Sequence, residues 1–204
     1  MPYYHDLITQ KSWQLLQSLG KKFDFVLIGG WAVFLYTGAL KSKDIDLILD
    51  YPQLEQMKNE FSIIKNERLK KYEAKTEEID IDIYLPFYSD LGVPVEEVVK
   101  LTMRLEGFKV PKIELLALLK AKALTERKNS TKGRKDLIDL VSLFALESFS
   151  FGEFRELAEK YRLNELVELV GSEIKIISQI EELGLNVHRM AVFKRKILPQ
   201  LLTQ

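Results

Sequence analysis

The chain has 204 residues, 47% hydrophobic and 29% charged, which is typical of a folded soluble protein rather than a disordered one. Lys plus Arg and Asp plus Glu both number 30, so no global charge favours nucleic acid or an anionic membrane, and such contacts need a local patch. Cysteine is absent, and His5 and His188 are too few for a histidine-rich zinc site, which leaves oxygen ligands for any metal.

The first half of the chain alternates between helical and strand-like patterns. Apolar residues at helical spacing predict a helix over 6–19 that ends at the following glycine. The aromatic and β-branched run "FDFVLI" predicts a buried strand over 23–28, and "WAVFLYTGA" then predicts a short helix. "KDIDLIL" predicts a second strand over 43–49, and Pro52, tolerated in a first turn, opens a predicted helix over 52–64.

Two further strands precede a change to helical texture. "KKYEAKT" and "EIDIDIYLP" predict neighbouring strands or a hairpin, so that the order β-α-β-α-β-β makes a small mixed sheet with helices against it. Past Pro94 the apolar spacing predicts helices over 111–127 and 134–147. Residues 152–202 contain no convincing strand and indicate two or three more helices.

These patterns predict an α+β protein with a small mixed sheet and a C-terminal helical region. We expect a mixed α/β core over 1–93 and a helical domain over 94–204, without a linker rich in Gly, Ser or Pro. No segment has the apolar length that spans a bilayer, so we expect no membrane contact and a cytoplasmic location.

Two aspartates stand among aliphatic residues in the predicted strand over 43–49. The side-chain period of a strand puts Asp44 and Asp46 on one face, about 6 to 7 Å apart, and the aliphatic residues on the other. Like charges this close repel unless a cation lies between them, and Mg²⁺ typically takes one or two carboxylates together with phosphate oxygens. A solvent-exposed face of a half-covered sheet is the structural alternative.

The strand predicted over 78–86 repeats the acidic pattern. Asp80 and Asp82 share one face there, and if this strand lies beside the first, a third carboxylate faces the same metal site. Three carboxylates can hold two metal ions for an in-line phosphoryl displacement. We predict Asp82 as the third ligand because it lies further into the strand, with Asp80 as the alternative.

A glycine pair ends the first predicted strand. Without a β-carbon, Gly29 and Gly30 allow a tight turn close to a ligand, and the N–H groups of the following helical turn can donate hydrogen bonds to phosphate oxygens. A plain strand-to-helix turn is the structural alternative.

The order of these motifs is more specific than any one of them. A strand, Gly-Gly, a short helix, "SKDIDL" and a later acidic strand together resemble the DNA polymerase β-type nucleotidyltransferase superfamily. The resemblance covers roughly 23–147 and implies an NTP substrate with Mg²⁺ or Mn²⁺. It places Gly29, Gly30 and Ser42 near the triphosphate. It assigns the metal and catalysis to Asp44, Asp46 and Asp82.

Within that superfamily the chain looks most like the AbiEii-like branch of bacterial and archaeal nucleotidyltransferases, some of which are toxins of toxin–antitoxin pairs. That branch tends to carry a helix with a Lys, an Arg about two turns on, and then a Lys-Asp-x-x-Asp helix, here "LLALLKAKALTER" and "KGRKDLIDL". The resemblance implies nucleotide binding by Lys120 and Lys135. Since the helix after Gly30 lacks a basic residue near the turn, the triphosphate would depend on these lysines.

The basic segment supports the same assignment physically. Arg134 and Lys135 open the predicted helix over 134–147, where the macrodipole disfavours an exposed cation by about 0.3 to 1 kcal/mol, so a bound anion would compensate. The alternative for Lys135 is a surface ion pair with Asp139 at i, i+4. For Asp136 and Asp139 we expect a structural role.

We therefore expect an enzyme that moves a nucleoside monophosphate from an NTP to a hydroxyl acceptor and releases pyrophosphate. RNA (tRNA included), a protein hydroxyl and a small molecule are all left open as acceptors, and the basic C-terminal segment "NVHRMAVFKRKILPQLL" is either an RNA grip or a solvated helix face. The alternatives are a nucleotide-binding module without turnover and a toxin–antitoxin interaction module with a small partner protein.

Overall fold

A computed structural model describes residues 6–76 and 78–202. The chain divides into two compact units, with the boundary between Lys112 and Ile113. We call the part up to Lys112 the sheet unit and the part from Ile113 the helical unit. His5 lies outside the described residues.

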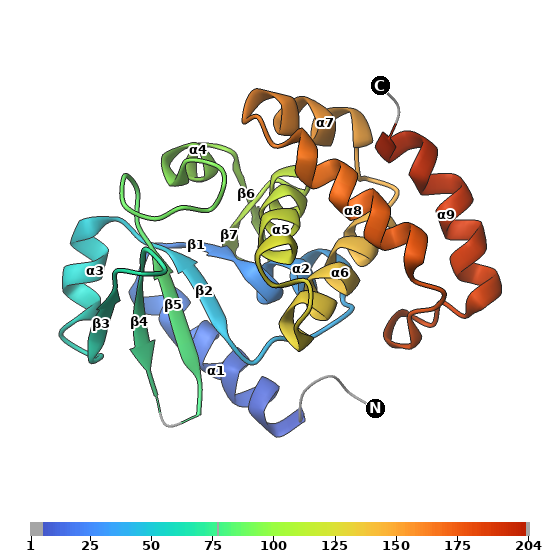
Figure 1. Cartoon of the computed structure of the whole chain (residues 1–204). Helices are drawn as coiled ribbons and strands as arrows, with labels where there is room; N and C mark the ends of the chain where they lie inside the picture. The colour runs from blue at the N-terminus through green and yellow to red at the C-terminus, as the bar shows by residue number, and fades with distance from the viewer. Residues whose placement is uncertain (1–5, 77, 203–204) are drawn as a thin grey trace. The chain divides into compact units, whose positions relative to one another are not determined.

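The sheet unit contains seven strands in one mixed sheet, with the order β3-β4-β5-β2-β1-β7-β6 (Figure 1). Its strands are β1 (Val26–Ile28), β2 (Ile45–Ile48), β3 (Ile63–Asn66), β4 (Lys71–Lys75), β5 (Asp80–Tyr84), β6 (Thr102–Leu105) and β7 (Phe108–Pro111). Its helices are α1 (Asp6–Lys22), α2 (Gly29–Thr37), α3 (Tyr51–Met57) and α4 (Val95–Lys100). The pairs β1–β7 and β2–β5 are parallel, and the other neighbouring strands are antiparallel.

Alternating residues in the central strands build the core of the sheet unit. Ile45 and Leu47 of β2 and Ile81 and Ile83 of β5 are all buried, whereas the aspartates between them face the other side of the sheet. Helix α1 contacts α2 through Trp13, whose ring centroid is 5.0 Å from that of Trp31.

Three strands form where the sequence pattern does not predict them. The stretch predicted as one helix over 52–64 ends as helix at Met57, and its last residues enter β3, because Ile63 and its β-branched neighbour pair with β4. The segment 102–111 forms the β6–β7 hairpin, and β7 joins the sheet beside β1. The hairpin thus belongs to the sheet unit, which extends to Lys112.

The helical unit is built on two neighbours, α5 and α6; α7 and α8 pack against α5, and α9 packs against α8 and α7 (Figure 1). Its elements are α5 (Ile113–Arg127), α6 (Thr131–Phe144), α7 (Phe151–Lys160), α8 (Asn164–Ile176), the short 3₁₀ helix η1 (Glu181–Leu183) and α9 (Val187–Leu202). The predicted α+β class, with a mixed sheet, flanking helices and a C-terminal helical region, is confirmed. Among the described helices, none is both long and apolar enough to cross a membrane.

Candidate functional site

Three carboxylates lie in a row across neighbouring strands of the sheet unit. Asp46 of β2 is the register partner of Asp82 in parallel β5, and Asp82 is in turn the partner of Glu73 in antiparallel β4. Register partners point to the same face, with neighbouring strands about 4.8 Å apart. Two unit charges about 5 Å apart repel by about 3 kcal/mol at an effective dielectric constant of 20, so such a row needs cations.

Gly29 lies directly against the first carboxylate of this row. It begins α2 with a φ of 68°, and a β-carbon there would be only 2.0 Å from Oδ2 of Asp46. The residue before it, Ile28, offers no side-chain cap to α2. The carboxylate of Asp46 therefore lies beside the positive end of the α2 dipole, in a space that only glycine leaves open.

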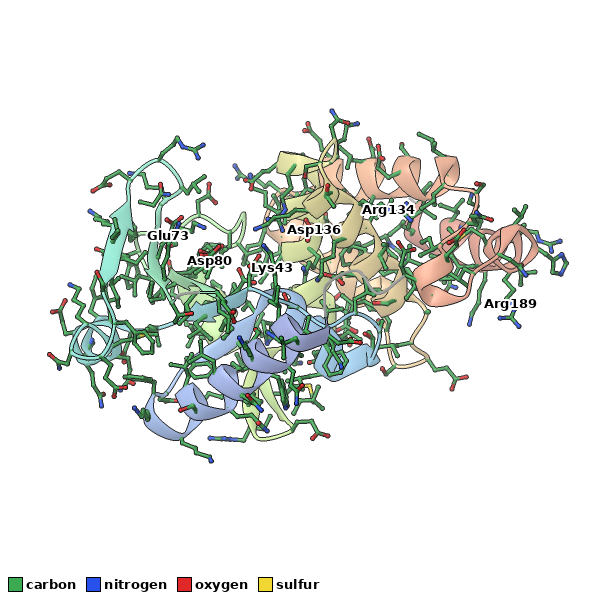
Figure 2. All side chains as sticks on the ribbon, turned by 90° about the horizontal axis from the view of Figure 1, so that it is seen from below. Lys43, Glu73, Asp80, Arg134, Asp136 and Arg189 are labelled. Atoms are coloured by element: carbon green, nitrogen blue, oxygen red, sulfur yellow. The ribbon has the colours of Figure 1, made fainter. Side chains whose placement is uncertain are left out.

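The remaining predicted residues of the sheet unit flank this row. Asp44 precedes β2 with 17% of its side chain exposed, and its Oδ1 is 3.8 Å from Nζ of Lys43. Ser42 is buried just before it. Asp80 is exposed at the start of β5, in register with Lys75 (Figure 2), whereas Asp82 is the residue in register with Asp46.

Lys71 supplies a cation to the row. Its Nζ donates to Oδ2 of Asp82 at 2.6 Å and lies 3.1 Å from Oε1 of Glu73, which also accepts from the Asn66 amide at 3.0 Å. Burial works to lower the pKa of Lys71, but the Asp82 and Glu73 carboxylates outweigh it and raise that pKa above its ordinary value. The ammonium therefore stays charged at neutral pH.

These residues offer the oxygen ligands that Mg²⁺ prefers. Asp44 lies two residues before Asp46, just ahead of β2, and Asp82 is adjacent to Asp46, although one of its oxygens is already bound by Lys71. As the described side chains stand, no three carboxylates or histidines are grouped for metal binding. The donor set fits a metal that completes its shell with water and phosphate oxygens.

Lys120 and Lys135, the predicted nucleotide-binding lysines, come together in the helical unit as a buried charged cluster. Nζ of Lys120 is 2.7 Å from Oδ2 of Asp139 and 3.1 Å from Oδ1 of Asp136, and Lys135 donates to Oδ2 of Asp139 at 3.1 Å. Arg127 donates to both oxygens of Asp136. The Lys135–Asp139 pair is thus buried rather than on the surface, while Figure 2 shows Asp136 within the helical unit.

Burial and pairing shift the pKa values in this cluster. Burial lowers the pKa of Lys135, and the nearby Asp139 only partly opposes it. Burial acts to raise the pKa of Asp136, but Lys120 and Arg127 lower it below its ordinary value.

The start of α6 differs from the prediction and removes one argument for an anion there. The helix begins at Thr131, with Ser130 as its cap accepting from the Gly133 N–H at 3.0 Å. Lys135 therefore lies beyond the first turn, and Arg134 pairs with Glu182 at 3.0 Å. The macrodipole no longer requires a compensating anion at either residue.

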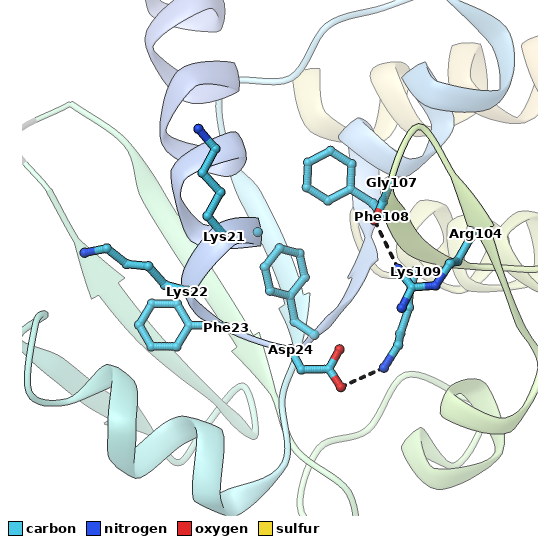
Figure 3. A pocket seen from close by; sticks show the side chains of 10 residues that line it. Lys21, Lys22, Phe23, Asp24, Arg104, Gly107, Phe108 and Lys109 are labelled. Atoms are coloured by element: carbon cyan, nitrogen blue, oxygen red, sulfur yellow. Dashed lines mark hydrogen bonds and ion pairs between the residues drawn. The ribbon is translucent and has the colours of Figure 1, made fainter.

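A groove of about 310 Å³ lies elsewhere in the sheet unit, at the start of β1 rather than beyond its end (Figure 3). It is basic, but Lys109 pairs there with Asp24 at 2.7 Å, and Lys22 pairs with Glu60 at 2.5 Å. Lys21 and Lys22 also lie in the last turn of α1, where cations are favoured by the helix dipole. Local structure thus accounts for most of its charge.

Comparison with known proteins finds similarity in three dimensions only. No protein-family model and no curated protein matches the chain. The solved structure of JHP933 from Helicobacter pylori matches with a TM-score of 0.50 and 16% identity, over 95% of this chain and 91% of that one. An antigenic nucleotidyltransferase-like protein from Paracoccidioides brasiliensis matches over 83% of this chain and 94% of that one, at 16% identity. Its TM-score of 0.43 is too low to support an inference, and the likeness to JHP933 shows a shared fold and nothing more.

Glu73 and Lys71 are the site residues that the sequence pattern does not reveal. The alternation in "KYEAK" does predict that Lys71 and Glu73 share one face of a strand, but not that this face belongs to the site. What makes them part of the site is the register of β4 against β5, and this depends on the β3–β4 and β4–β5 connections rather than on local pattern.

Proposed function

We propose that the protein is a nucleotidyltransferase that moves a nucleoside monophosphate from an NTP to a hydroxyl group with the help of Mg²⁺ or Mn²⁺. The observation that carries the proposal is the register of Asp46 with Asp82 beside the crowded turn at Gly29. This arrangement joins carboxylates for a divalent ion to a helix N-terminus suited to phosphate oxygens. The motif order in the sequence supports the same reading.

The residues have distinct roles in this proposal. Asp44 and Asp46 would hold the metal, which when bound neutralises the triphosphate and the leaving pyrophosphate. The turn at Gly29 and Gly30 would position phosphate oxygens, and Asp82 would orient the acceptor side of the site. The hydroxyl oxygen attacks the α-phosphorus and its proton passes to water, the bond from that phosphorus to the bridging oxygen breaks, and pyrophosphate leaves with the electron pair of that bond.

The helical unit has a separate place in the proposal. A nucleotide contact by Lys120 and Lys135 stays a prediction that follows from the resemblance, because both ammonium groups have buried carboxylate partners within their own unit. The acceptor, a toxin role and a cognate antitoxin also stay predictions.

The test is incubation with each α-labelled NTP and Mg²⁺ in the presence of total RNA, proteins or small hydroxyl compounds. We expect label transfer to one acceptor class by the wild type and its loss in Asp44→Ala and Asp46→Ala. Transfer of equal strength in Asp44→Ala contradicts the proposal.

A nucleotide-binding module without turnover is the second candidate, and one observation favours it. Lys71 already pairs with Asp82, the carboxylate predicted as the third metal ligand. Calorimetry separates the two functions, because the module binds NTP with Mg²⁺ but releases no pyrophosphate over a long incubation.

A further inference from the structure

Lys71 lies where a cation bound to Asp82 would be expected. Its ammonium is within 3.1 Å of two carboxylates, Asp82 and Glu73, and only 13% of its side chain is exposed. The Asn66 amide of β3 donates a hydrogen bond to Glu73, so the contacts of this group run across β3, β4 and β5. An exposed lysine gains little from an ion pair, because ordering its side chain costs conformational entropy. The side chain of Lys71 is already restricted by the surrounding strands.

The geometry points to Lys71 as a built-in replacement for a second metal ion, so that the site binds one divalent cation, through Asp44 and Asp46. This inference rests on the proposed function and refines it. In that scheme Lys71 is a positioning residue, since it acts by holding Asp82 in place and by keeping a second ion away.

The place of Lys71 disfavours a second divalent ion at Asp82. The row and its flank carry four carboxylates, namely Asp44, Asp46, Asp82 and Glu73. The Lys71 ammonium lies 2.6 Å from Asp82 and 3.1 Å from Glu73. A divalent ion bound to Asp82 would therefore lie next to an ammonium group and be repelled by it.

Asp80 lies opposite a different lysine. It is the register partner of Lys75, so the next carboxylate on β5 has its own opposite charge on β4. Lys75 is exposed and shares the face of β4 with Lys71, which makes it the matched control for a change at Lys71.

The test counts bound Mn²⁺ per chain by the paramagnetic resonance signal of the free ion, with and without a non-hydrolysable ATP analogue. We expect one ion in the wild type, two in Lys71→Met, and one in both Lys71→Arg and Lys75→Met. The return to one ion in Lys71→Arg is the decisive readout, because it shows that the positive charge at this position sets the number of ions. A lysine with only a structural role would leave that number unchanged in every variant. Two ions in the wild type, no ion in the wild type, or no gain in a folded Lys71→Met overturns the inference.

A second variant keeps the test decisive if Lys71→Met does not fold, as judged by circular dichroism. Asp82→Asn should keep the single ion, whereas Asp46→Asn should lose it, and loss of the ion in Asp82→Asn overturns the inference. The count does not depend on activity. A wild type that transfers label but binds two ions refutes this inference alone, and one that binds a single ion without any transfer refutes the proposed function alone.

Discussion

Gly29 and Gly38 both have left-handed backbones, with φ values of 68° and 65°, yet their surroundings differ. A β-carbon at Gly29 would clash with the Asp46 carboxylate, whereas one at Gly38 meets nothing within 4 Å. Alanine in this conformation costs about 1 to 2 kcal/mol from backbone sterics alone. The pair therefore separates backbone strain from displacement of a site residue.

We predict that Gly29→Ala lowers the free energy of unfolding more than Gly38→Ala and that only Gly29→Ala weakens Mn²⁺ binding, because only there is Asp46 displaced. Urea unfolding measures the first effect and Mn²⁺ titration the second. Equal effects of the two substitutions would show that the space beside Asp46 is not needed for the ion.

Asp139 is the least balanced residue of the buried charged cluster. Its Oδ2 faces both lysines, while its Oδ1 has no hydrogen-bond partner among the described residues. Buried ion pairs of this kind contribute little net stability, because burying both charges costs about as much as their attraction returns. Removing one partner is costly, because it leaves the other charge buried and uncompensated.

We predict that Asp139→Asn lowers the free energy of unfolding by about 3 kcal/mol, because it leaves Lys135 buried without its counter-charge. The double variant Lys135→Met/Asp139→Leu should recover most of that loss. The exposed i, i+4 pair of Lys122 and Glu126 is the control, and Glu126→Gln should cost less than about 0.5 kcal/mol. A double variant as unstable as Asp139→Asn would contradict this account.

Helices α5 and α6 act as one element in this cluster, because Asp136 on α6 binds Lys120 and Arg127 on α5. The lowered pKa of Asp136 means that its ionised form is favoured in the folded state. Its contribution to stability is therefore complete above its ordinary pKa near 3.8 and is lost as pH falls through the lower folded value.

We predict that the stability difference between the wild type and Asp136→Asn is largest at neutral pH and shrinks below about pH 4. Protonation of Asp136 in the wild type then removes the charge that the variant already lacks. Urea unfolding of both proteins at pH 7 and pH 3 measures the difference. A difference that is independent of pH would mean that the pair contributes through packing rather than charge.

At the level of elements, local pattern predicts the acidic strands well and the edges of the sheet poorly. The alternation in "KDIDLIL" and "EIDIDIYLP" predicts that Asp46 of β2 and Asp82 of β5 can share one face of the sheet, and their register pairs them. The β6–β7 hairpin is not predicted by the sequence pattern; in the structure, Glu106 and Gly107 form its two-residue turn with positive φ at both positions. Its place beside β1 is set by tertiary pairing, which no local pattern contains.

The same limit applies to the site. The order of aspartates and glycines in the sequence identifies the candidate metal ligands. The ion-pair partner of each charged residue depends instead on strand register and on helix packing. Lys71 reaches Asp82 because β4 pairs with β5, and Lys135 is buried in a helix, α6, that packs against α5. The sequence therefore indicates which residues carry charge, and the fold decides which of those charges are compensated.

At the scale of the whole molecule, the predicted metal ligands and the predicted nucleotide-binding lysines belong to different units. Gly29, Asp44, Asp46, Asp82 and Lys71 all lie before residue 113, whereas Lys120 and Lys135 lie after it. The two units are also joined by a short connection, since β7 ends at Pro111 and α5 begins at Ile113. Every residue of the proposed divalent-ion site thus belongs to the sheet unit.

We predict that a chain of residues 1–112 keeps the Mn²⁺ binding of the whole protein, because every proposed ligand and Lys71 belong to it. Circular dichroism checks that the shortened chain is folded, and Mn²⁺ titration compares the number of ions and their affinity. NTP affinity, measured by calorimetry on the same two chains, then tests the prediction for Lys120 and Lys135. A large loss in the shortened chain, reproduced by Lys120→Met in the whole chain, supports a nucleotide contact by the helical unit, and an unchanged affinity makes those lysines part of a buried ion-pair cluster only.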